Sequence, residues 1–107
     1  MIVEAFASND GARWMVEQAR RLTGRAPTHT VITHYHGDHT AGLRGMVETP
    51  GVEVLGTDVT IDLSRQNGGE SSDALKSATQ IDARRPTEID LGDRSVILVP
   101  RRGHTRS

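Results

Sequence analysis

A short run of three histidines and one aspartate constrains this chain more than any other feature of its sequence. His34, His36, Asp38 and His39 fall within six consecutive residues. They directly follow residues 29–33, a β-branched stretch that predicts a short buried strand. The four side chains therefore lie on a strand-to-helix loop, and active sites of layered α/β folds are usually found at such strand ends. We expect an α/β fold with ligands at its strand ends.

The spacing of these residues suits a metal site. Two histidines two positions apart on a short turn can direct both imidazoles at one point, and three neutral nitrogens with one water make a tetrahedral catalytic zinc site. His34 and His36 supply two such nitrogens, while Asp38 and His39 can face a neighbouring point. Two metals about 3.5–4 Å apart can share a hydroxide and polarise one scissile bond. A surface His–Asp pair or a poly-histidine tract is the plainer alternative, but such tracts lack the interposed Gly37 and Asp38.

Capping residues and apolar spacing predict a helix near the start of the chain. A short strand is expected over residues 2–6, and Ser8-Asn9-Asp10 then supplies typical N-cap residues. Gly24 is a typical C-cap residue. Between them, over residues 11–23, apolar residues at spacings of three and four define one helix face: Ala12, Met15, Ala19 and Leu22. We expect Trp14, beside this face, to pack against the core.

Further elements are predicted after the histidine motif. We expect a helix over residues 40–47 capped by Thr40, a strand over residues 52–55 closed by Gly56, a helix start over residues 58–63, a loop over residues 64–73 and a short helix over residues 74–81. Gly68-Gly69 is not a phosphate loop, because no strand leads into it and no Lys-Ser/Thr follows it. Residues 87–91 and 94–99 predict a hairpin around a type II′ turn at Gly92-Asp93.

Length and composition support one small domain spanning residues 1–107. Only 35% of the residues are hydrophobic, whereas roughly 45–50% is usual on a count that includes glycine, so a metal, a partner or further chain would complete the core. The formal net charge of −1 gives no reason to expect nucleic acid or an anionic membrane as a partner. Arg101, Arg102 and Arg106 form a basic cluster that we expect to be solvated.

The sequence also limits the ligand types and the compartment. It contains no cysteine, which excludes disulfides and thiolate zinc ligands. No apolar run approaches the roughly 18–20 residues of a membrane span, and the first residues lack the basic and apolar segments of a signal peptide. We therefore expect a cytoplasmic protein by default, with a small-molecule substrate and neither nucleic acid nor membrane as a partner.

Three segments together resemble one known family. Residues 33–43, Thr-His-Tyr-His-Gly-Asp-His-Thr-Ala-Gly-Leu, are similar to the H-x-H-x-D-H motif of the metallo-β-lactamase superfamily, including the Gly and Leu that follow it. Gly103-His104-Thr105 resembles the family's second histidine loop, commonly Pro-Gly-His-Thr, and Gly92-Asp93 resembles its hairpin. The resemblance implies an αββα sandwich, of which this chain would form roughly the N-terminal half.

The resemblance also implies a ligand set and a reaction. His34, His36 and His104 would bind a first zinc ion, and Asp38 and His39 would bind a second. Asp38 would be the catalytic residue that orients the water or hydroxide and takes up a proton during turnover. A zinc-bound hydroxide would be the nucleophile, because zinc lowers the pKa of its water to about 7. The reaction would be hydrolysis of an ester, thioester, amide or phosphoester.

Departures from the family pattern leave a second hypothesis open. Arg102 replaces the usual proline before Gly103, and the family's bridging aspartate and later histidine would come after Ser107. The second zinc site would then be incomplete, and an uncovered core face would favour self-association. We expect the isolated chain to be weakly active or inactive. The alternative is a non-catalytic zinc-binding remnant or a truncated gene product, while a small interaction module without metal leaves the histidine spacing unexplained.

Two other residues could be mistaken for site residues. His29 precedes the motif and does not match it, so we expect a residue at the strand entry without a metal role. Glu4 could pass for a catalytic carboxylate, but no partner for it is evident in the sequence.

Overall fold

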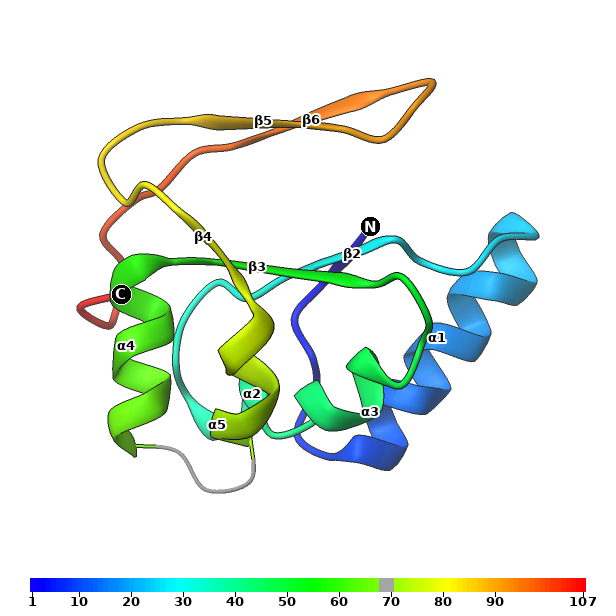
Figure 1. The fold of residues 1–107 in the computed structure, drawn as a ribbon, viewed down its shortest axis with the longest axis horizontal. Helices are drawn as coiled ribbons and strands as arrows, with labels where there is room; N and C mark the ends of the chain where they lie inside the picture. The colour runs from blue at the N-terminus through cyan, green and yellow to red at the C-terminus, as the bar shows by residue number, and fades with distance from the viewer. Residues whose placement is uncertain (68–70) are drawn as a thin grey trace.

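A four-stranded parallel sheet forms the centre of the computed structural model, which describes residues 1–67 and 71–107 (Figure 1). Its strands run in the order β1 (Ile2–Val3), β2 (His29–Val31), β3 (Glu53–Thr57) and β4 (Thr79–Ile81). A separate antiparallel hairpin joins β5 (Thr87–Asp90) to β6 (Ser95–Leu98). The helices are α1 (Asn9–Thr23), α2 (Gly37–Thr40), α3 (Leu43–Val47), α4 (Asp58–Asn67) and α5 (Ser71–Ala74), followed by a 3-10 turn at Leu75–Ser77.

The sheet lies between the helices and the hairpin (Figure 1). Paired residues of parallel strands point to the same face, so the register places Ile2 and Val54 on one face and Val3, Val31 and Leu55 on the other. The first face carries the helices, and the second faces the hairpin. The chain is therefore layered in the manner expected of part of an αββα sandwich, which confirms the predicted α/β class.

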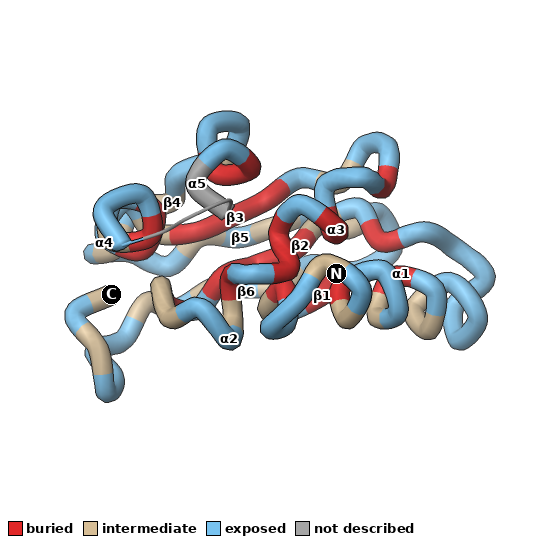
Figure 2. The backbone as a smooth tube through the Cα atoms, turned by 90° about the horizontal axis from the view of Figure 1, so that it is seen from below, coloured by how far each residue is buried: buried red, intermediate tan, exposed pale blue. Residues whose placement is uncertain are grey.

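Two clusters of buried side chains hold the helices against the sheet. The first joins β1 to α1 and α3 through Ile2, Ala12, Val16 and Met46. The second joins the centre of the sheet to α3, α5 and the turn that follows, through Ala5, Ile32, Leu43, Val54, Ala74 and Leu75. Buried residues accordingly concentrate along β2 and β3 (Figure 2). The core is small and aliphatic, as the composition predicts.

The first helix begins and ends where its capping residues predict. The hydroxyl of Ser8 accepts a hydrogen bond from the amide of Gly11 at 3.0 Å, and Gly24 ends the helix with a φ of 72°. The predicted buried face is wrong at its far end, because Leu22 is 85% exposed. Trp14 is 62% exposed, so the expectation that it packs in the core is also wrong, and Val16 is buried instead.

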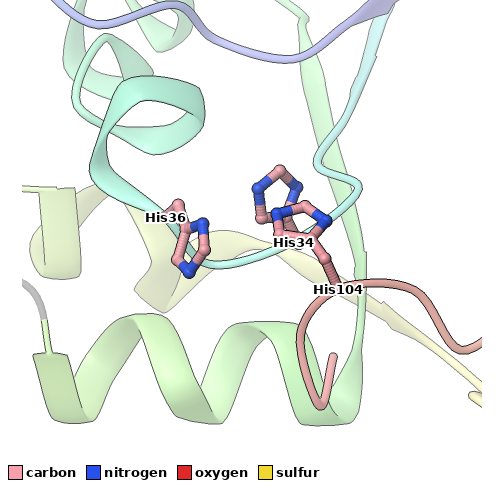
Figure 3. A group of neighbouring side chains, drawn as sticks. All are labelled: His34, His36 and His104. Atoms are coloured by element: carbon pink, nitrogen blue, oxygen red, sulfur yellow. The ribbon is translucent and has the colours of Figure 1, made fainter.

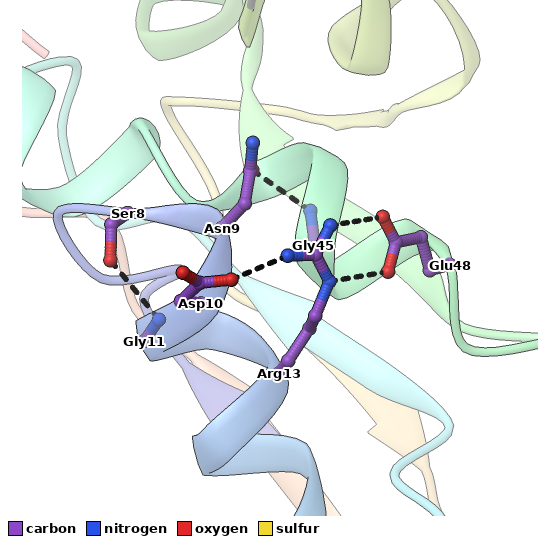
Figure 4. Close-up of polar contacts among 7 residues, drawn as sticks. All are labelled: Ser8, Asn9, Asp10, Gly11, Arg13, Gly45 and Glu48. Atoms are coloured by element: carbon purple, nitrogen blue, oxygen red, sulfur yellow. Dashed lines mark hydrogen bonds and ion pairs between the residues drawn. The ribbon is translucent and has the colours of Figure 1, made fainter.

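Polar contacts fasten the start of α1 to α3 (Figure 4). Arg13 donates two hydrogen bonds to the carboxylate of Glu48, at 2.7 and 2.6 Å, and a third to Asp10 at 2.7 Å. The side-chain oxygen of Asn9 accepts from the amide of Gly45 at 3.0 Å. Arginine and carboxylate meet here in the paired, two-bond geometry that fixes orientation as well as distance.

The segment after β1 ties the start of the chain to the histidine motif. The predicted strand over residues 2–6 ends at Val3, because Glu4 and Phe6 adopt positive φ angles of 76° and 67°. The amide of Ala5 donates to the carbonyl of His39 at 2.9 Å, and the amide of Gly42 donates to the carbonyl of Phe6 at 3.0 Å. These bonds hold α2 beside the end of β1.

Several predicted boundaries after the motif are wrong. The expected helix over residues 40–47 is two short helices, and Thr40 ends the first of them, donating from its hydroxyl to the carbonyl of His36 at 3.1 Å. Gly56 lies inside β3, which continues to Thr57. The expected loop over residues 64–73 is helical at residues 64–67 and 71–73, while Gly68-Gly69 lies outside the described residues. The segment predicted as a helix over residues 74–81 ends in strand β4.

The hairpin is confirmed. Gly92 has a φ of 100°, as the first turn residue of a type II′ turn requires, and the amide of Leu91 donates to the carbonyl of Arg94 at 2.7 Å.

Within the described ranges, no helix combines the length and the apolar character that crossing a membrane requires.

Candidate metal centre

Three imidazole rings meet at the carboxyl end of β2 (Figure 3). His34 and His36 lie on the link from β2 into α2, and His104 comes from the segment after β6. One ligand nitrogen from each ring lies within 4.8 Å of the others. The ring centroids are 4.9 Å apart for His34 and His36, 4.7 Å for His34 and His104, and 5.2 Å for His36 and His104. The fold thus brings together side chains that are distant in the sequence.

His34 has the environment of a metal-binding imidazole. It is 7% exposed, and its Nε2 is buried without a hydrogen-bond partner in the described structure. Its Nδ1 lies 2.9 Å from the hydroxyl of Thr33. Burial lowers the pKa of His34, and the neighbouring His39 lowers it further. The ring is therefore held in the neutral form, which is the form that binds a metal.

The donor set at this point fits zinc. A buried polar atom without a partner is rare and needs an explanation. A bound metal ion would explain the unpartnered Nε2 of His34. Three imidazoles with one position open to solvent form a recurrent zinc-binding set. His36 is half-buried and His104 exposed, so the open position faces solvent.

Asp38 and His39 lie in the first turn of α2, next to the three-histidine group. The Nε2 of His39 is 3.4 Å from a carboxylate oxygen of Asp38, and the side chain of Asp38 is 71% exposed. Two groups of donors in the described chain could hold a metal, His34 with His36 and His104, and His34 with His39 and Glu4. Asp38 is in neither group, and its role as ligand and catalytic residue stays a prediction.

Glu4 is the site residue that the sequence did not reveal. Its carboxylate accepts hydrogen bonds from the hydroxyl and the amide of Thr33, and one oxygen lies 3.4 Å from Nδ1 of His39. The expectation that Glu4 has no partner is therefore wrong. One signal was available, because Glu4 directly follows the first strand, and the carboxyl ends of parallel strands meet at one edge of a sheet.

His29 lies apart from both donor groups. Its Nδ1 is 2.7 Å from the hydroxyl of Thr28, and its Nε2 is 3.4 Å from a carboxylate oxygen of Glu53 on the adjacent strand. It belongs to neither of the metal-capable groups of the described residues. This position at the start of β2 agrees with the expected structural role.

A cavity of about 710 Å³ lies between the sheet and the hairpin, and its described lining includes none of the three histidines. The sheet face opposite the helices supplies one wall, with Val3, Val31 and Ile81, and the hairpin supplies Leu98 and Val99. Thr33, which precedes His34, also lines it. The arginines on both sides of His104 line the cavity as well: Arg101, Arg102 and Arg106. The cavity thus has apolar walls and a basic rim, and its lining includes residues that are close to His34 and His104 along the chain.

Three imidazoles gathered at the carboxyl edge of a parallel sheet form a group that could hold a metal ion in a layered α/β protein. The chain belongs to the metallo-beta-lactamase superfamily, whose family model matches residues 2–107. This confirms the resemblance found in the sequence. A search of curated proteins found no match.

Solved structures agree with this assignment at the level of the fold. The chain is similar to the metallo beta lactamase from Hirschia baltica, with a TM-score of 0.54 and 23% sequence identity. The similarity covers 60% of this chain and 29% of that structure. The chain therefore spans less than a third of the length of this relative.

Proposed function

We propose that the chain provides the first metal site of a zinc-dependent hydrolase that cleaves an ester, thioester, amide or phosphoester. The observation that carries the proposal is the buried, unpartnered Nε2 of His34, with the rings of His36 and His104 close by. Membership of the metallo-beta-lactamase superfamily supports it. The family covers many activities, so the cleaved bond is proposed only as one of these four types.

The residues of the site would have different roles in metal binding and in proton transfer. His34, His36 and His104 would hold a zinc ion, which when bound supplies a Lewis acid and lowers the pKa of a coordinated water to about 7. Asp38 and His39 would contribute to a second ion. The carboxylate of Asp38 faces solvent within 3.4 Å of His39, a position that suits a group taking up a proton during turnover.

A small-molecule substrate suits the cavity between the sheet and the hairpin. Its volume of about 710 Å³ lies within the roughly 300–1,000 Å³ of most ligand pockets. Its apolar walls would hold the body of the substrate, while Arg102 and Arg106 would attract an anionic group. The formal net charge of −1 gives no electrostatic support for nucleic acid as the substrate.

Zinc affinity measured by chelator competition tests the metal part of the proposal. We expect wild-type chain to bind zinc and His36→Ala to bind it at least ten-fold more weakly. His29→Ala is the matched control, because His29 lies outside both donor groups, and it should bind as wild type does. Equal zinc affinity in His36→Ala and wild type would reject the assignment of the site.

A screen of chromogenic esters, thioesters, amides and phosphoesters tests the hydrolase part. Turnover that disappears in His36→Ala and persists in His29→Ala would support catalysis. One observation favours the alternative of metal binding without turnover, since Asp38 is 71% exposed and belongs to neither donor group of the described chain. A zinc-loaded chain without turnover of any of the four substrate types would support that alternative.

A further inference from the structure

A second group of metal donors lies beside the three-histidine group, and it uses a residue outside the histidine motif. Donor atoms of Glu4, His34 and His39 lie within 4.8 Å of one another. Glu4 comes from the end of β1, whereas His34 comes from the link between β2 and α2, and His39 comes from α2 itself. We propose that Glu4, His34 and His39 form a second metal site, distinct from the pair of Asp38 and His39, and that it excludes the first site, the three-histidine group, because both need His34.

Glu4 is held in place from both sides. Its amide donates to the carbonyl of Val31 at 2.8 Å, and the amide of the next residue, Ala5, donates to the carbonyl of His39 at 2.9 Å. Its φ of 76° is uncommon for a residue with a side chain, and strained backbone persists where the surroundings enforce it. The carboxylate is thus positioned by backbone bonds to the same two segments that carry the histidines.

The described contacts of the carboxylate supply hydrogen bonds but no fixed positive charge. The side chain of Glu4 is 21% exposed. Its described contacts are with Thr33 and His39, neither of which carries a fixed positive charge. A carboxylate in a partly buried position is stabilised by pairing with a cation or by binding a metal. One carboxylate with two imidazoles is also a known donor set of catalytic zinc sites.

The two sites exclude each other because of the chemistry of imidazole. A neutral imidazole has one nitrogen with a free lone pair and one that carries a proton. His34 can therefore bind one ion at a time, either with His36 and His104 or with Glu4 and His39. The rings of His34 and His39 lie 4.1 Å apart, closer than His34 lies to His36 or to His104.

The second site differs from the first in what it needs from the fold. All its donors precede residue 40, whereas the first site needs His104 from the segment after the hairpin. The second site is therefore complete before that segment is in place. It would hold an ion that later passes to the three-histidine site, and it would give one negative charge to the ion where the first site gives none.

The test separates the two sites by substitution in the full-length chain. The double variant His36→Ala/His104→Ala lacks the first site, and we expect it to retain one zinc ion per chain by native mass spectrometry. Adding Glu4→Gln, which keeps the size of the side chain and removes its charge, should reduce the stoichiometry to zero. The matched control adds Glu88→Gln on the exposed side of β5 and should leave the ion bound.

Each result is decisive. A double variant without zinc, beside a wild type that binds it, overturns the second site and leaves the proposed function standing. Loss of the residual ion with Asp38→Asn but not with Glu4→Gln overturns it in favour of Asp38 as the donor. The inference rests on the proposed metal site, so a wild type that binds no zinc overturns both. Should circular dichroism show the double variant unfolded, His36→Asn/His104→Asn, with and without Glu4→Gln, gives the same comparison.

Discussion

Gly42 lies at the closest backbone approach near the metal centre, and replacing it with alanine gives a sharp test of the structure. Its backbone angles, φ −86° and ψ 2°, are open to any residue. A Cβ at this position, however, would lie 1.8 Å from the carbonyl oxygen of Ala5 and 2.6 Å from that of Ser8. Both are backbone atoms that cannot rotate away, and Ala12 lies 3.0 Å away on a third side. The substitution must therefore move main chain.

The expected loss of stability lies at the upper end for overpacking, about 3 kcal/mol, because the clash is with backbone rather than with flexible side chains. With a urea m-value of about 1.5 kcal/mol/M, this loss lowers the unfolding midpoint by about 2 M. Far-UV circular dichroism during urea titration of the metal-free protein measures it. The displacement of the main chain at Ala5 should also weaken zinc binding, because the amide of Ala5 donates to the carbonyl of His39.

Gly37→Ala is the control for this measurement, since a Cβ there would meet nothing within 4 Å. We expect its midpoint to stay close to that of wild type. Equal midpoints for Gly42→Ala and Gly37→Ala would refute the close approach between the link after β1 and the start of α3.

Three further outcomes follow from the structure. Leu43→Ala should destabilise the chain by about 2–5 kcal/mol in urea unfolding, because Leu43 is fully buried, whereas Leu22→Ala, at an 85% exposed position, should change stability by less than about 0.5 kcal/mol. Thr33→Val removes the hydroxyl between Glu4 and His34 and should weaken zinc binding by about 10–100-fold in a chelator competition; unchanged affinity would contradict this role. Burial lowers the pKa of His34 below its ordinary 6.5, so the unfolded chain takes up this proton at a higher pH than the folded chain does. Stability of the metal-free protein should then decline as the pH falls below 6.5 in urea melts at stepped pH, and His34→Gln should flatten this decline.

Elements with strong local signals were predictable from the sequence. The first helix has an N-cap serine and a C-cap glycine, and both act as such in the structure. The hairpin was predictable because Gly92 can adopt the positive φ that the turn requires. The strand before the histidine motif is short, but its β-branched residues and the polar cluster after it mark its place.

Elements decided by tertiary pairing were not predictable. Strand β4 contains one apolar residue in Thr79-Gln80-Ile81, and its pairing with β3 is what makes it a strand. Gly56 interrupts a strand pattern in the sequence, yet pairing with β4 carries β3 past it to Thr57. The apolar stripe of α1 ends at an exposed Leu22, because the parallel sheet does not extend under the last turn of that helix.

The site was predictable as far as its motif reaches. Local spacing marked His34 and His36 as neighbours, and the similarity of the later loop to a family pattern pointed to His104. Glu4 was missed because a positive φ turns its side chain toward the motif, and no pattern predicts that conformation for a glutamate. Its contact with His39 depends on how two distant segments meet in space.

His104 lies far from His34 and His36 in the chain, and this separation has a consequence for folding. An ion held by His36 and His104 would act as a reversible cross-link that closes a loop of about 70 residues, which in the chain-entropy treatment of cross-links restricts the unfolded ensemble by about 4 kcal/mol. That loop contains β3, β4 and the whole hairpin. Removing the ion with a chelator would therefore remove a cross-link that spans more than half of the polypeptide. Amide hydrogen exchange in the hairpin should then accelerate before that in α1.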